Sequence, residues 1–205
     1  MNIRITDPIR EVQRLLSRCV VQFASFDAEI VRVLGLASIA DYSSIIDCFY
    51  TFEDTELAKG HIRSNGLSAA DGQHDFGLVY LKFYGLMNAC YLQQQAVVVC
   101  TERLGLATDL ARVNASPLIQ YRNDFAAHSP NRGRGKAEHS YILDRFGLLE
   151  GRVSGYSSNA PTGFMPKDAK LLDLLSEWDD TFAEALAPVC QHIASSIRAA
   201  GVNET

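Results

Sequence analysis

Residues 75–104 read DFGLVYLKFYGLMNACYLQQQAVVVCTERL. Apolar side chains return in this stretch every three or four residues, which is the spacing of one face of an amphipathic helix. They are Phe76, Tyr80, Phe83, Met87, Cys90, Val97 and Leu104. Gln94 interrupts this face, so we expect it to be buried with a hydrogen-bond partner or to lie at an interface, while Gln93 and Gln95 point elsewhere. A long helix with such a face is typical of a helical bundle.

The helical spacing continues toward the N-terminus. Asp7–Pro8 reads as the N-cap and first residue of a helix, because Asp accepts a backbone N–H and Pro has none to leave unpaired. The apolar face of this helix runs on to Val33, and Gly35 is a suitable end. A second helix is predicted over residues 43–59, with Gly60 as its C-terminal stop.

The spacing also continues toward the C-terminus. Thr108 can cap a fourth segment, and Ser116–Pro117 restarts it as a new cap and first turn. We expect this segment to end near His128, because a proline two residues later disfavours helical geometry just before it. The last helix is predicted over residues 168–199, with a kink at Pro188.

Residues between the last two helices break the pattern. Glycines recur there, and a small β-hairpin fits residues 141–156, followed by a loop over 157–167. The whole sequence predicts an all-α, up-and-down bundle of about five helices, with a small irregular or β-hairpin insert at about 140–165. Its length fits a single domain over residues 1–205.

The composition excludes several classes of protein. The five cysteines are odd in number and include no CxxC pair, so we expect buried thiols in a reducing cytoplasm and no disulfide framework. The histidines outside residues 121–128 show no paired ligand spacing, and we expect neither a metal site nor a cofactor. No apolar run approaches the ~18 residues of a membrane span, and the start lacks an apolar signal core. We therefore expect a soluble cytoplasmic protein without membrane contact.

One segment carries candidate chemistry. Residues 121–128 read YRNDFAAH, and a glycine-broken basic loop with Arg132, Arg134 and Lys136 follows. Residues 103–152 carry a net charge of +3, whereas the rest of the chain carries −8. A positive region in an acidic protein suits a phosphate-bearing ligand such as RNA or a nucleotide.

The residue types in this segment fit cleavage of a phosphodiester. Arg122 presents a rigid fork of donors that stabilises charge on phosphate oxygens. His128 titrates near neutral pH and can carry a proton. Asp124 lies four residues before the histidine and could orient its ring, and Asn123 offers both a donor and an acceptor. On an unbroken α-helix Arg122 and His128 would lie about 120° apart, which a two-fold dimer with both motif copies in one cleft would resolve.

This run resembles the signature of the HEPN superfamily, small helical-bundle domains in which an Arg, often followed by a polar residue, precedes a His by a few positions. Arg122, Asn123 and His128 match that pattern, with five residues between the Arg and the His. The resemblance implies a helical bundle over about residues 8–130, frequent homodimers, and metal-independent endoribonuclease activity. It also implies Arg122 and His128 as catalytic residues, Asn123 as a supporting residue, and a role in phage defence or as a toxin with an antitoxin partner.

Simpler interpretations remain open beside this one. Arg and His near a helix end also satisfy free carbonyls and the helix dipole, and Asp124 fits a plain surface carboxylate. The basic loop fits a solvated segment. The same bundle could bind a nucleotide, RNA or a protein without turnover, or act as a helical scaffold with no ligand.

Overall fold

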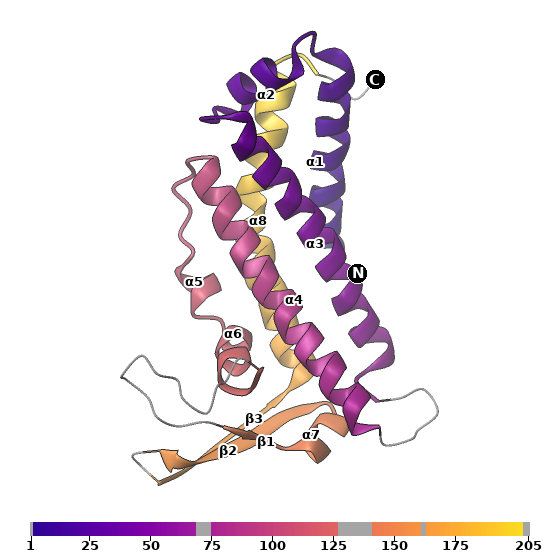
Figure 1. The fold of residues 1–205 in the computed structure, drawn as a ribbon, viewed down its shortest axis with the longest axis vertical. Helices are drawn as coiled ribbons and strands as arrows, with labels where there is room; N and C mark the ends of the chain where they lie inside the picture. Colours follow the sequence, from indigo (N-terminus) through magenta and orange to yellow (C-terminus); the bar gives the residue numbers. More distant parts are fainter. Residues whose placement is uncertain (1, 69–74, 127–140, 161–162, 203–205) are drawn as a thin grey trace. The chain divides into compact units, whose positions relative to one another are not determined.

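The computed structural model describes residues 2–68, 75–126, 141–160 and 163–202 (Figure 1). The protein is an all-α helical bundle with a small antiparallel sheet, as the sequence predicts. Its contacts form two compact units. Unit 1 comprises residues 1–57, 92–114 and 179–205, and unit 2 comprises residues 58–91 and 115–178.

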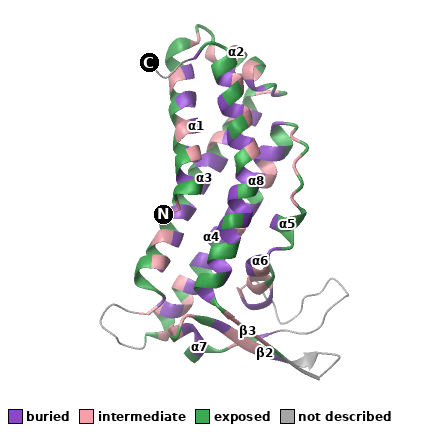
Figure 2. Ribbon diagram, turned by 180° about the vertical axis from the view of Figure 1, so that it is seen from behind, coloured by how far each residue is buried: buried purple, intermediate pink, exposed green. Residues whose placement is uncertain are grey.

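Unit 1 contains only helices among its described regular elements. It holds α1 (Ile3–Gln22), α2 (Phe26–Leu34), α5 (Ala111–Asn114) and parts of α3 (Ile39–Asn65), α4 (Phe76–Arg103) and α8 (Leu171–Ala199). Buried residues follow one side of α1 and exposed ones the other (Figure 2). On α3 and α8, the rings of Phe52 and Phe182 pack edge to face with centroids 5.4 Å apart.

Buried polar side chains also join the helices of unit 1. Gln94 donates to the Asn114 side chain at 2.9 Å, which confirms the expected buried hydrogen bond. Its neighbour Gln93 points elsewhere, as expected, and donates to Glu56 on α3 at 2.9 Å. Gln93 is also fully buried, so two adjacent faces of α4 are covered in unit 1.

Unit 2 contains the sheet. Its elements are α6 (Pro117–Tyr121), the π-helix η1 (Arg122–Ala126), β1 (Ile142–Leu143), α7 (Arg145–Leu149), β2 (Arg152–Ala160) and β3 (Gly163–Lys170), with the remaining parts of α3, α4 and α8. The strands are antiparallel in the order β1-β2-β3. Tyr156 on β2 pairs with Ile142 on β1 and with Pro166 on β3. The insert is thus a three-stranded sheet, and the loop predicted over 157–167 was wrong.

Several helix ends differ from the predicted ones. The first helix begins at Ile3 rather than after Asp7, because the Asn2 side chain accepts the Arg4 N–H and donates to Asp179 on α8. Pro8 consequently lies inside α1. The chain then leaves helical geometry at Phe23, so the predicted long helix is two helices, and Gly35 ends the second with a left-handed φ of 69°.

Two further expected caps were also wrong. The helix α3 runs through Gly60 to Asn65, and the left-handed residue that follows it is Gly66. Asp109 accepts the Ala111 N–H at 2.8 Å, a capping contact that was expected from Thr108. A helix starts at Pro117 after Ser116, as predicted, but the Ser116 side chain makes no capping hydrogen bond to it. The α-helical part ends at Tyr121, and the π-helix follows it.

The sheet approaches the π-helix closely at one glycine. A Cβ atom at Gly155 on β2 would lie 2.6 Å from Cε1 of Phe125 and would also overlap the carbonyl oxygen of Ile142. Phe125 is fully buried and packs on Tyr141 with ring centroids 5.4 Å apart. Only glycine lets β2 lie this close to both neighbours.

We therefore expect Gly155→Ala to lower the free energy of unfolding by about 1–3 kcal/mol, because the sheet or the Phe125 ring must move. Urea denaturation followed by circular dichroism measures this. Gly85→Ala is the matched control: its Cβ would meet no atom within 4 Å on α4, and helix propensity predicts a gain of up to about 1 kcal/mol. Equal stability changes in the two variants would contradict the close approach.

Candidate functional site

The predicted motif lies on the π-helix of unit 2. Arg122, Asn123 and Asp124 are its first three residues, directly after α6. A π-helix has i→i+5 hydrogen bonds and occurs mostly as single turns, often at functional sites. The α-helical estimate of 120° between Arg122 and His128 therefore does not apply to this segment. His128 lies outside the described residues, as do Arg132, Arg134 and Lys136.

Arg122 is held by two neighbours. Its guanidinium carbon lies 3.9 Å from the centroid of the Tyr91 ring on α4, a cation–π contact. Its Nη1 donates to Oδ1 of Asn123 at 3.1 Å. Arg122 and Asn123 are both half-buried. The stacking fixes the plane of the guanidinium, and the hydrogen bond fixes its rotation in that plane.

Asp124 points to a different neighbour. Its buried carboxylate forms an ion pair with Nζ of Lys167 on β3. The pairing of Asp124 with the His128 ring stays a prediction, and the cation that the structure brings to this carboxylate is Lys167. The interpretation of Asp124 as a plain surface carboxylate does not fit its burial.

Aromatic rings surround the Lys167 ammonium group. Its Nζ lies 4.9 Å from the ring centroid of Tyr141 and 5.5 Å from that of Tyr121. Both rings contact Phe125, at centroid distances of 5.4 and 5.8 Å. Burial raises the pKa of the Tyr121 phenol, and the nearby Lys167 charge opposes that rise. Tyr121 therefore remains a neutral phenol at neutral pH.

Three of these residues, Tyr91, Lys167 and Tyr141, carry no signal of a site in the sequence. Tyr91 lies on the helix that the periodicity predicts, but its contact with Arg122 joins positions far apart in the chain. Lys167 falls in the stretch that was predicted as a loop, so nothing placed it opposite Asp124. Tyr141 follows the basic loop directly and had no assigned role.

Other chemistry finds little support in the described residues. Among them, no three His, Cys, Asp or Glu side chains gather into a metal-binding group. All five cysteines are buried and none forms a disulfide, as predicted. Burial raises the pKa of Cys19 to about 11 and that of Cys190 to about 12. These two thiols stay protonated and unreactive at neutral pH. None of the helices in the described ranges is both long and apolar enough to cross a bilayer.

Comparisons of the chain with models of known protein families, with curated proteins and with solved structures find no match. The geometry of the η1 segment and its neighbours is therefore the basis for assigning a function.

We expect Lys167→Met to lower the free energy of unfolding by about 1–3 kcal/mol, because Asp124 then loses its cation while it remains buried. Replacing both partners in Asp124→Asn/Lys167→Met should recover part of the loss. Lys170→Met, an exposed lysine on the same strand, is the control and should change stability by less than about 0.5 kcal/mol. Chemical denaturation compares the variants, and a Lys167→Met protein as stable as the control would refute a structural role for the pair.

Proposed function

We propose that the chain is a metal-independent endoribonuclease of the HEPN type, with Arg122 and His128 at the scissile phosphate. The observation that carries the proposal is the setting of Arg122, a half-buried guanidinium stacked on Tyr91 and hydrogen-bonded to Asn123. A positioned arginine at this place in the motif is what the resemblance requires.

The proposed reaction uses the ribose 2′-OH as the nucleophile. His128 takes the proton from this hydroxyl, and the 2′ oxygen attacks the adjacent phosphorus. The bond between phosphorus and the 5′ oxygen breaks, that oxygen takes a proton from water, and His128 releases the proton that it took to the solvent. The products are a 2′,3′-cyclic phosphate and a 5′-hydroxyl end. No bond of this sequence requires a metal or a cofactor.

Arg122 would stabilise the charge that builds on the non-bridging phosphate oxygens. Its planar fork matches two such oxygens, and a fixed guanidinium loses little conformational freedom when the substrate arrives. Preorganised donors of this kind are typically worth about 10²–10³ in rate. Asn123 supports the orientation of Arg122, and Arg132, Arg134 and Lys136 would hold neighbouring phosphates of the RNA.

A second function uses the same residues without turnover. The pairing of Asp124 with Lys167 favours it, since this carboxylate is engaged by a cation other than the His128 ring. In this alternative the chain binds RNA, a nucleotide or a protein at Arg122 and the basic loop. The resemblance to the HEPN superfamily also implies two protein partners: a second copy of the chain and an antitoxin.

We expect the purified protein to cleave single-stranded RNA in the presence of EDTA and to leave cyclic-phosphate ends. His128→Ala should lower the cleavage rate by about 10²–10⁴, because the proton carrier is gone. Arg122→Lys keeps the charge but loses the fork and the stacking on Tyr91, and should lower the rate at least about tenfold. A gel assay with labelled RNA and an end-group analysis measures both effects.

His139→Ala is the matched control, a nearby histidine outside the motif that should leave the rate unchanged. Full activity of His128→Ala would refute the assignment. Salt-sensitive RNA binding with no cleavage by the unmodified protein would instead support the binding function.

A further inference from the structure

We propose that the face formed by α1 and the first part of α3 in unit 1 binds a second copy of this chain in a two-fold symmetric dimer. The residues of this face belong to unit 1 and those of the candidate site to unit 2, so the dimer is independent of the ribonuclease proposal. Three features favour it: an apolar groove, opposite charges along the two helices, and matching positions of those charges along the helix axes.

The groove between α1 and α3 is the apolar centre of this face. It has a volume of about 380 Å³ and is lined mainly by apolar and aromatic side chains: Leu16, Val20, Tyr42, Ile46, Phe49 and Tyr50. Val20 is 58% exposed and Tyr50 is 60% exposed. On the same two helices Val21 is 85% exposed and Leu57 is 55% exposed. Large apolar side chains gathered in this way mark an interaction surface.

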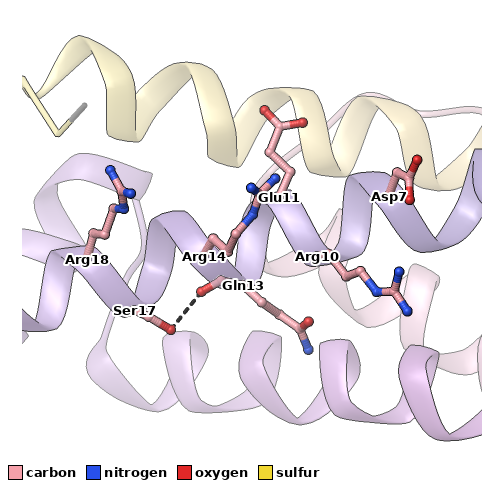
Figure 3. A pocket seen from close by; sticks show the side chains of 7 residues that line it. All are labelled: Asp7, Arg10, Glu11, Gln13, Arg14, Ser17 and Arg18. Carbon is pink, nitrogen blue, oxygen red and sulfur yellow. Dashed lines mark hydrogen bonds between the residues drawn. The ribbon is translucent and has the colours of Figure 1, made fainter. Parts of the chain in front are cut away.

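The two helices carry opposite charges beside this groove. Arg10, Arg14 and Arg18 recur every fourth residue along α1, and Figure 3 shows this helix running between α8 (pale yellow) and α3 (purple), with Arg18 on the side away from α3. On α3, Asp47 and Asp54 are exposed and lie two helical turns apart. Asp7 and Glu11 lie among these arginines, and Glu11 pairs with Arg198 on α8. The rim on α1 is therefore net positive, and the rim on α3 is acidic.

The positive charges of α1 and the negative charges of α3 lie at matching positions along the helix axes, and 'height' below means this position. The Gln13 side chain donates to Glu53 at 3.3 Å, and Val20 lines the groove with Tyr42 and Ile46, so α1 and α3 run antiparallel. Counted from the Gln13–Glu53 contact, Asp54 lies within about two residues, or about 3 Å, of the height of Arg14. Counted in the same way, Asp47 lies within about one residue of the height of Arg18.

Consider a dimer whose two-fold axis runs parallel to α1 and α3. Rotation about this axis places α3 of the second copy over α1 of the first and does not change the position of any residue along the axis. Arg14 then faces the second copy's Asp54, and Arg18 faces the second copy's Asp47. The same pairs form on the other side of the axis, and the apolar side chains meet between them.

This self-complementarity selects the occupant. An acidic partner would match α1 but repel α3, and a basic partner would do the reverse. In a dimer of two copies, the basic rim of each copy meets the acidic rim of the other, and both copies use the same surface, as an isologous interface requires. An apolar centre with a charged rim is also the usual anatomy of a protein interface.

The test exchanges the charges. Arg14→Glu/Arg18→Glu makes both helices acidic, and Asp47→Lys/Asp54→Lys makes both basic. Each variant alone should raise the dimer dissociation constant at least about tenfold, because like charges then face each other. An equimolar mixture of the two should dimerise again, since every facing pair in the mixed dimer is of opposite charge. Sedimentation velocity of the full chain measures all three samples.

Arg32→Glu/Lys170→Glu is the control, because it removes the same net charge at two exposed positions that do not line the groove, and it should leave the dimer intact. Val21→Glu changes a side chain too exposed to affect folding and should weaken the dimer on its own. A monomeric unmodified protein at about 100 µM would overturn the proposal and leave the groove to a foreign partner. Dimers that persist in both charge variants, or a mixture that stays monomeric, would overturn it as well.

Discussion

The ion pair between Lys167 and Asp124 fixes the arrangement of the candidate site, because it ties the strand β3 to the π-helix η1. Each partner depends on the other: a buried carboxylate needs a cation, and the ammonium group lies among aromatic rings that only partly replace water. Breaking such a pair costs more than forming it contributes. The position of η1, and of Arg122 two residues before Asp124, follows from this contact.

Two parts of the π-helix have different roles. Asp124 and Phe125 are buried and anchor the segment, against Lys167 and against Tyr141 near Gly155. Arg122 and Asn123 remain half-buried beside Tyr91. A rigid anchor behind a partly accessible guanidinium is the arrangement that preorganised charge stabilisation needs, because the donors are then fixed before a ligand arrives.

The helices that the sequence predicts best are those with long periodic faces. The stretch at 75–104 matches α4 closely, since its apolar face is buried from Phe83 to Leu104. The ends were less predictable because tertiary contacts override local signals. Asn2 begins α1 one turn early through its bond to Asp179, and α3 passes through Gly60 because a glycine in a packed helix costs only about 1 kcal/mol.

The site was predictable only in the part that is local in sequence. Arg122 and Asn123 stand out by their spacing to His128 and by the basic region around them. Tyr91 and Lys167 carry no such signal, because their roles arise from pairing between segments far apart in the chain. The strand that carries Lys167 is rich in residues typical of loops. Lys167 pairs in register with Gly155 on β2, whose missing side chain admits Phe125 of η1 and the backbone of Ile142 on β1. Gly155 lies inside the hairpin that the sequence predicts, but its role as the point where β2 meets β1 and the π-helix depends on contacts between distant segments, which no spacing in the sequence reveals.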